Sequence, residues 1–190
     1  MENKTKILKL LNNINRTGVE RLTAWLINND FFDALCSTKH HLNVKGGLAE
    51  HSLNVFELLK EKNKRYKLGL SYSSIIICGL LHDVCKVNFY ELVPANWDKH
   101  KEAYYKTNDK FPMGHGEKSV IIIQRFIQLT DEEACIIRWH MAAFDLSEYG
   151  KRSYYSALKL YPACLALHTA DYESTVLIED RGKNGYNKQS

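Results

Sequence analysis

The sequence predicts an all-α protein, a single helical bundle. Apolar residues recur at helical spacing, no stretch alternates convincingly with a period of two, and only three prolines and ten glycines interrupt the 190 residues. A chain of this length can bury a substantial core, and 45% apolar with 25% charged residues is an ordinary globular balance. We expect one domain over residues 1–180 and a loose polar tail over 181–190, which has two glycines and no apolar periodicity.

Charge and cysteine content narrow the functional classes. A net charge of +4 suits an anionic substrate such as a nucleotide, but no basic arm indicates binding to duplex DNA. The N-terminus lacks the apolar run of a signal peptide, and the longest apolar stretch, Ile75–Leu81, is too short to span a bilayer. Five cysteines, an odd number, are spread singly, which indicates buried free thiols in a reducing compartment and predicts a cytoplasmic protein.

The first half of the chain is predicted to form three helices. Thr17 can cap a helix that runs to about Asn29. After the break at Gly46-Gly47, a second helix carries His51 on the same face as its leucines and valine. Capping hydroxyls at 71–74 precede Ile75–Leu81, which is apolar all round and is therefore predicted to be central.

The stretch Pro94–Pro112 is the least regular part of the sequence. It is charged, rich in tyrosine and bounded by prolines. We interpret it as a long loop or partial helix, and such loops in small domains are often functional. It leads directly into Gly114-His115-Gly116.

Three helical segments follow. Residues Glu117–Gln128 have helical spacing. Thr130 and Glu133 form a capping box for a helix that runs to about Phe144. Pro162 can occupy the first turn of the last long helix.

Ionisable side chains fall on the apolar faces of these helices. His51, His82 and His140 each lie on an apolar stripe, and Asp83 and Asp171 follow apolar residues at one-turn spacing. Buried imidazoles and carboxylates are costly unless they are paired, hydrogen-bonded or bound to metal. Several of them pointing inward from different helices therefore indicate one shared polar centre, as in metal sites of helical proteins.

A competing interpretation applies to each histidine taken alone. A single histidine on an apolar stripe is more often a hydrogen-bonded core residue than a ligand. We leave four other histidines in that class: His40, His41, His100 and His168, the last of which is one turn from Asp171 and could support a ligand. The adjacent pair His82-Asp83 differs, because two neighbouring ionisable groups after a wholly apolar helix are hard to bury without a cation.

Three motifs resemble the HD superfamily of metal-dependent phosphohydrolases. They are Gly47-Leu48-Ala49-Glu50-His51-Ser52, then Leu80-Leu81-His82-Asp83-Val84-Cys85-Lys86, then Ala170-Asp171. Their order and spacing are similar to the His…His-Asp…Asp signature of that superfamily over roughly residues 40–175. The resemblance implies an HD-type helical bundle in which His51, His82, Asp83 and Asp171 bind one divalent metal.

One stretch of the sequence also resembles a particular subgroup of HD proteins. The stretch His40-His41…Gly46-Gly47-Leu48-x-x-His51 is similar to the HD domain at the C-terminus of certain bacterial 3′-to-5′ exoribonucleases. This chain has no room for the N-terminal OB-fold of those enzymes, which argues against a processive RNA-degrading role.

Two further histidines point to a second metal ion. His115 and His140 lie between the His82-Asp83 pair and Asp171, in the order found in HD proteins with two metals, where Asp83 would bridge. Otherwise His115 is a capping or loop residue, His140 is a core histidine, and a single metal is bound. Imidazoles with carboxylates suit Mn²⁺, Fe²⁺, Ni²⁺, Co²⁺ or Zn²⁺ better than Mg²⁺.

The resemblance implies hydrolysis of a phosphate ester by a metal-activated hydroxide. Asp83 and Lys86 are the expected catalytic residues, with Lys86 approaching a phosphate oxygen as a point charge. Alternatively, Lys86 is an exposed helix-end lysine that interacts with the helix dipole. The expected substrate is a nucleotide or short oligonucleotide, and a homodimer is the default assembly.

Two other functions stay open. The same ligand set resembles that of the HD-fold di-iron oxygenases, such as myo-inositol oxygenase, which activate dioxygen. Some HD-like domains are instead non-catalytic nucleotide-binding regulatory modules that have lost their ligands. Every signature ligand is present here, which argues against such a loss.

Overall fold

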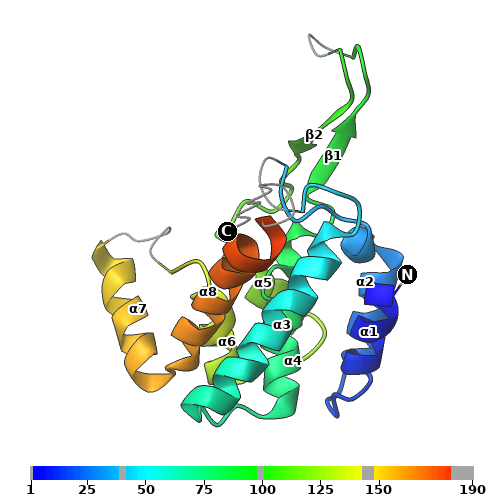
Figure 1. Cartoon of the computed structure of the whole chain (residues 1–190). Coiled ribbons are helices and arrows are strands. Elements are labelled where there is room, and N and C mark those ends of the chain that lie inside the picture. The colour runs from blue at the N-terminus through cyan, green and yellow to red at the C-terminus, as the bar shows by residue number, and fades with distance from the viewer. Residues whose placement is uncertain (1, 39–41, 98–100, 143–147, 181–190) are drawn as a thin grey trace, which may run out of the picture.

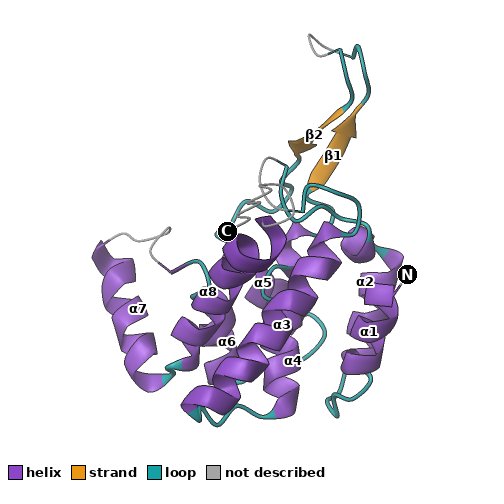
Figure 2. Cartoon of the chain, in the orientation of Figure 1, coloured by secondary structure: helices purple, strands orange, loops and turns teal. Residues whose placement is uncertain are grey.

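Helices dominate the computed structural model, which describes residues 2–38, 42–97, 101–142 and 148–180 (Figure 1). The predicted all-α class is confirmed (Figure 2). The longest helix, α3 (Gly47–Tyr66), packs against α4 (Tyr72–Leu81) and α8 (Ala163–Glu173). The other elements are α1 (Glu2–Leu11), α2 (Val19–Asn28), α5 (His115–Gln124), α6 (Asp131–Arg138), α7 (Glu148–Leu160), the 3₁₀ turns η1 (Asp30–Phe32) and η2 (Val84–Lys86), and the π-helical segment η4 (Ser174–Glu179).

Helix α4 lies at the centre of the core, as its composition predicts. Every residue from Ser74 to Leu81 is buried, and α4 contacts α1, α3 and α6. The Ser71 hydroxyl accepts a hydrogen bond from the Ser74 backbone N–H, so the predicted capping serine begins the helix. The buried apolar side chains form one connected cluster that extends from Ile7 to Ala170.

A close approach of two helices fixes how α3 lies against α4. A Cβ atom added at Gly79 would lie 2.6 Å from the Cα atom of Phe56. Only glycine leaves room for the backbone of α3 at this point. The contact lies one turn before His82 and a little more than one turn after His51 along their helices.

The stretch Pro94–Pro112 is partly a β-hairpin, which corrects the expectation of a loop or partial helix. Strands β1 (Tyr90–Val93) and β2 (Tyr104–Thr107) pair antiparallel, with Tyr90 opposite Thr107 and Val93 opposite Tyr104. The hairpin projects from one end of the helical body (Figure 1). Tyrosine, valine and threonine favour strands. Only Val93 of the eight strand residues is buried, so no alternating pattern marks them in the sequence.

The start of α2 differs from the prediction. Gly18, not Thr17, is its N-cap residue, and no side chain caps the helix. Gly18 has a left-handed backbone (φ 91°), and a Cβ there would lie 1.9 Å from the Phe126 carbonyl oxygen. The tight contact with the segment after α5 therefore decides where α2 begins.

Two predicted helices are shorter than expected. Helix α5 ends at Gln124 rather than Gln128. The capping box of Thr130 and Glu133 is confirmed, but α6 ends at Arg138 rather than near Phe144. The C-cap residue Trp139 already has a non-helical backbone (φ −99°, ψ 13°), and the positive φ of Ala142 (42°) also prevents a helix from continuing to residue 144.

The last long helix begins nearly as predicted. Pro162 is the N-cap residue of α8, immediately before its first turn. Among the described residues, no helix combines the length and the apolar character needed to cross a membrane. The predicted tail over 181–190, together with His40, His41, His100 and Phe144, lies outside the described residues.

Replacing Gly79 with alanine tests the α3–α4 contact. Alanine gains about 1 kcal/mol of helix propensity over glycine, whereas forcing a methyl group into a packed contact costs about 1–3 kcal/mol. Because the added Cβ would lie 2.6 Å from a backbone atom, we place the cost at the upper end of that range and expect Gly79→Ala to lower the free energy of unfolding in urea by about 1–2 kcal/mol. Ser73→Ala on the same helix is the control and should change it by less than about 0.5 kcal/mol. A Gly79→Ala protein as stable as the parent would contradict this packing.

Candidate metal centre

Five ionisable side chains from four different helical segments meet in the interior. His51 comes from α3, His82 and Asp83 follow the end of α4, His140 follows α6, and Asp171 lies on α8. The side chains of the three histidines are completely buried, and that of Asp83 is 4% exposed.

Short distances join these groups. His51 Nε2 lies 3.1 Å from Asp171 Oδ1 and 3.3 Å from His82 Nε2. Asp83 Oδ2 lies 3.7 Å from His82 Nε2 and 3.9 Å from His51 Nε2. The other oxygen, Asp83 Oδ1, lies 3.4 Å from His140 Nε2. Asp83 is therefore between two sets of imidazoles, where a carboxylate could bridge two cations.

The backbone orients two of the imidazoles. His82 Nδ1 lies 3.0 Å from the Gly79 carbonyl oxygen, and His140 Nδ1 lies 2.7 Å from the Ile137 carbonyl oxygen. A carbonyl oxygen only accepts, so each Nδ1 carries the proton and donates it. In the neutral rings, the lone pair is then on Nε2, the atom that faces Asp83. Metal-ligating histidines are commonly fixed by such a bond from the other ring nitrogen.

A buried carboxylate orients the third imidazole. His51 Nδ1 lies 3.0 Å from Glu179 Oε1, and the side chain of Glu179 is completely buried. Ser174 Oγ and Asn54 Nδ2 also donate to this carboxylate, at 2.5 and 3.1 Å. Nothing in the sequence marks Glu179, because it is 128 residues from His51 and belongs to a π-helical segment without a periodic pattern.

Electrostatics keeps the carboxylates charged. Burial by itself would raise the pKa of Asp83, but the Lys86 ammonium and the neighbouring imidazoles hold it well below its usual range. Burial also opposes ionisation of Asp171, but its contact with His51 lowers the pKa of this carboxyl group. Burial lowers the pKa of His82 to about 4, so this ring is neutral at pH 7. The centre therefore offers anionic oxygens beside a neutral nitrogen donor.

The pKa of the His51 imidazole shifts in the opposite direction to that of His82. Burial disfavours its charged form, but Cys36, Asp171 and Glu179 outweigh that effect and raise the pKa of the imidazole well above its usual value. A positive charge is thus favoured between these groups. A metal ion bound there would displace the Nε2 proton, which couples binding to proton release.

His115 lies at the edge of this cluster. It is the first residue of α5, and its Nδ1 atom is 3.4 Å from Cys85 Sγ. Ligand atoms of Asp83, Cys85 and His115 all lie within 4.8 Å of one another. His115, the sixth predicted ligand, thus lies near Asp83 and next to the thiol of Cys85, which the sequence predicts to be buried.

Lys86 is held inside the cluster rather than at an exposed helix end. Its Nζ atom lies 2.5 Å from Asp83 Oδ2, and its side chain is 13% exposed. The Nδ1 atom of His168, which we expected to be near Asp171, lies 2.7 Å from the His140 carbonyl oxygen. Because a carbonyl only accepts, His168 is the donor and supports the His140 backbone.

A pocket of about 560 Å³ opens onto the centre. The described residues that line it are Asp83, Lys86, His115, His140, Met141, His168, Asp171, Tyr172, Thr175 and Asp180. Its volume is in the range of small-molecule sites, which run from about 300 to 1,000 Å³. Part of the polar centre therefore lines a pocket of small-molecule size.

The donor set fits a divalent transition metal. Groups of three metal-binding side chains within 4.8 Å of one another include His51, His82 and Asp171. In addition, the buried His140 Nε2 atom has no hydrogen-bond partner among the described residues and faces Asp83 Oδ1. An imidazole nitrogen that is buried without a hydrogen bond, next to a carboxylate, is a natural metal ligand.

Comparison with known proteins identifies the family. The family profile described as "HD domain" matches residues 48–175, well over half of the chain. The chain belongs to the HD domain family. No curated protein and no solved structure matches it, so the resemblance to exoribonuclease HD domains is not confirmed.

HD domain proteins are typically metal-dependent phosphohydrolases, and the match supports a divalent metal and a phosphate-ester substrate. The matched segment runs from the first residues of α3 into η4 and so spans all six predicted ligands. Glu179 lies four residues beyond the matched segment, so the family match does not include it. Only its contact with His51 in this structure points to a role at the centre.

Replacing Glu179 with glutamine tests whether this carboxylate supports the centre. The amide can still accept a hydrogen bond from His51, but it lacks the charge that makes the imidazole more basic. We expect affinity for Co²⁺, measured against a competing chelator, to fall about 10- to 100-fold. Glu173→Gln is the matched control, because Glu173 is paired with Lys62 and its side chain is 38% exposed. Equal affinities in Glu179→Gln and the parent would show that Glu179 has no such role.

Proposed function

We propose that this HD domain protein is a metal-dependent phosphohydrolase that acts on a nucleotide or short oligonucleotide. The observation that carries the proposal is the position of Asp83. Its carboxylate lies between the imidazoles of His51, His82 and His140, pairs with Lys86, and lines the pocket. Anionic oxygens, imidazole nitrogens and an ammonium thus line one cavity.

We assign two ions to the centre. His51, His82, Asp83 and Asp171 would hold the first, and Asp83, His115 and His140 would hold the second. The bound metal would supply a hydroxide at neutral pH and neutralise charge that builds up on phosphate oxygens. The second ion rests on the 3.4 Å distance between His140 and Asp83 and on the position of His115 beside them.

Lys86 is the residue of this chain that is best placed to bind a phosphate group. It lines the pocket, and its pKa is raised because Asp83 and Cys36 outweigh the effect of burial. It therefore stays a cation at neutral pH. An ammonium acts as a point charge without a fixed geometry, which suits a non-bridging phosphate oxygen.

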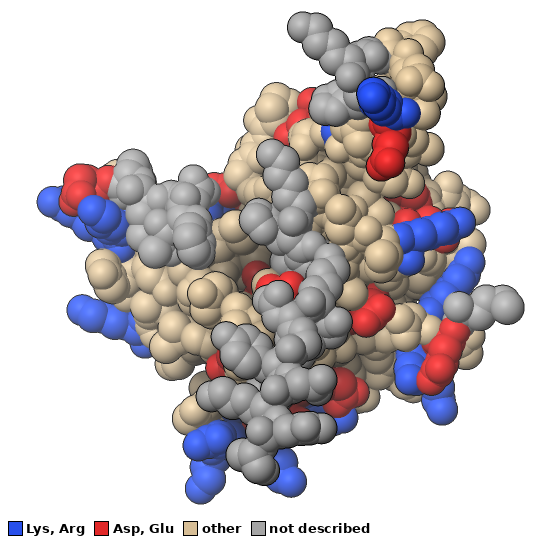
Figure 3. Space-filling view, turned by 45° about the horizontal axis from the view of Figure 1, so that its top comes forward, with Lys and Arg blue, Asp and Glu red and all other residues tan. Residues whose placement is uncertain are grey.

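The charges on the described part of the face drawn in Figure 3 favour a small substrate over a duplex. In Figure 3, lysine and arginine side chains are interspersed with aspartate and glutamate around the described part of this face. No continuous basic track crosses that described surface, whereas duplex binding depends on several phosphate contacts. Asp180 and Thr175 at the pocket offer acceptor groups that could contact a nucleotide.

Replacing Asp83 with asparagine tests the proposed function. Asparagine keeps the side-chain volume but loses the charge that bridges the two sides of the centre. With Mn²⁺ or Co²⁺ present, we expect hydrolysis of nucleotides or of short oligonucleotides by the parent, and a loss of more than about 100-fold in Asp83→Asn. Circular dichroism should show that helicity is kept.

Asp131→Asn is the matched control, because Asp131 is an exposed residue in the first turn of α6. Full activity in Asp83→Asn would overturn the proposed function. So would oxygen consumption by the iron-loaded parent without hydrolysis of any phosphate ester, because that result assigns the same centre to an HD-fold oxygenase.

A further inference from the structure

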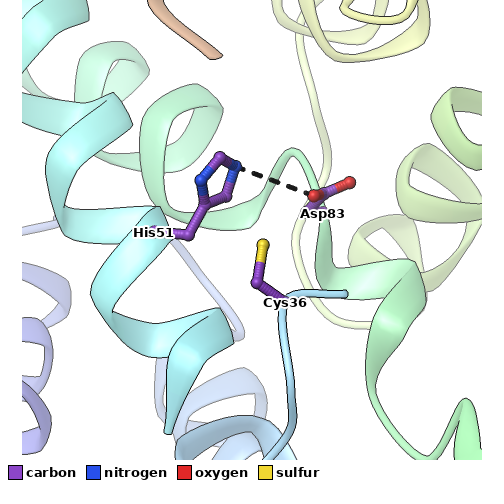
Figure 4. A group of neighbouring side chains, drawn as sticks. All are labelled: Cys36, His51 and Asp83. Atoms are coloured by element: carbon purple, nitrogen blue, oxygen red, sulfur yellow. Dashed lines mark ion pairs between the residues drawn. The ribbon is translucent and has the colours of Figure 1, made fainter. Parts of the chain in front are cut away.

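A cysteine lies beside the centre where the sequence indicates only a buried thiol. Cys36 follows η1, and its side chain is completely buried. Figure 4 shows its sulfur directed into the space between His51 and Asp83. Ligand atoms of Cys36, His51 and Asp83 lie within 4.8 Å of one another, and all three residues are buried.

Several contacts hold Cys36 in this position. Its backbone N–H donates to the Leu42 carbonyl oxygen at 3.3 Å, and its own carbonyl accepts from the Tyr90 hydroxyl at 3.4 Å. The loop is thus tied both to the segment before α3 and to the first strand of the hairpin. The thiol is therefore placed by the fold and does not depend on a helical face.

The sulfur of Cys36 contacts a cation that also pairs with Asp83. The Lys86 ammonium donates to Cys36 Sγ at 3.7 Å, while the same Nζ atom pairs with Asp83. On the other side of Asp83, the buried His140 Nε2 atom has no hydrogen-bond partner among the described residues. The centre thus has a nitrogen without a hydrogen bond on one side of Asp83 and a sulfur held by an ammonium on the other.

We propose that Cys36 supplies a thiolate ligand to the metal ion held by His51 and Asp83. The thiol loses its proton to solvent on binding, as coordinated thiols do. This inference rests on the metal centre of the proposed function but not on hydrolysis itself. A soft sulfur donor adds a preference for Zn²⁺, Co²⁺ or Fe²⁺ over Mn²⁺ and Mg²⁺.

Cys85 is the alternative sulfur donor. Its Sγ atom lies 4.0 Å from Asp83 Oδ1 and 3.4 Å from His115 Nδ1, on the side of the second proposed ion. Its cluster with Asp83 and His115 is less enclosed, because His115 is only partly buried. A ligand role for Cys36 and a ligand role for Cys85 therefore predict different effects of the cysteine variants on the same absorption spectrum.

The test is the absorption spectrum of the Co²⁺-loaded protein. A thiolate bound to Co²⁺ gives an intense charge-transfer band in the near ultraviolet, which nitrogen and oxygen ligands do not give. We expect this band in the parent, its loss in both Cys36→Ser and Cys36→Ala, and its retention in Cys85→Ser and in the control Cys135→Ser. We also expect Cys36→Ser to weaken Co²⁺ binding about tenfold or more and to change Mn²⁺ binding less.

A second measurement needs no variant and so remains valid if the Cys36 variants fail to fold. X-ray absorption of the Zn²⁺-loaded parent should show a sulfur neighbour at about 2.3 Å in addition to nitrogen and oxygen at about 2.0–2.2 Å. A zinc environment of nitrogen and oxygen alone would overturn the inference.

The outcomes separate the inference from the proposed function. Co²⁺ binding without the charge-transfer band, or a band that disappears only in Cys85→Ser, overturns the role of Cys36 and leaves the metal centre intact. A band that depends on Cys36 in a protein that hydrolyses no phosphate ester supports the thiolate ligand and overturns hydrolysis. Failure to bind Co²⁺ at all overturns both.

Discussion

Charge buried inside an apolar bundle is the constraint on which this structure depends. Asp83 is buried and the side chain of Asp171 is 20% exposed, yet the pKa values of both carboxyl groups are lowered, next to histidines that are completely buried. Without compensation such groups would protonate or would destabilise the fold by several kcal/mol each. The compensation available within the chain is Lys86 and the imidazoles. It is concentrated where a divalent cation would interact with all of these groups at once.

The apolar frame makes that arrangement possible. Helix α4 is buried along nearly its whole length and approaches α3 closely at Gly79 and Phe56, so the two histidine-bearing segments have little freedom to move apart. The hydrogen bonds from His82 and His140 to the carbonyls of their own helical turns then set the direction of each ring. Packing thus fixes the helices, and backbone hydrogen bonds fix the donor atoms.

Helical periodicity is the reason why much of the fold and part of the site could be predicted from the sequence. His51, His140 and Asp171 stand out because a polar residue on an apolar stripe has to point inward, and the His82-Asp83 pair follows a helix with no polar face. The structure does bring these side chains together, while their role as ligands stays a proposal. The family match over residues 48–175 agrees with the motifs that carried the resemblance.

Glu179 and Cys36 could not be predicted in the same way. Glu179 belongs to a π-helical segment and Cys36 to a loop, so neither is on a repeating face, and their partners are distant in the sequence. The hairpin over Tyr90–Val93 and Tyr104–Thr107 was missed because its strands are short and mostly exposed. The start of α2 lies at Gly18 because a tight tertiary contact overrides the capping signal of Thr17, and α6 ends early because the backbone leaves helical geometry at Trp139.

The most direct test of the central claim is the metal content of gently purified protein, measured by elemental mass spectrometry. We predict close to two equivalents per chain of manganese, iron, nickel, cobalt or zinc. One equivalent would mean that His115 and His140 hold no ion. Absence of bound metal, even after incubation with an excess of these ions and removal of the unbound fraction, would contradict the proposed metal centre.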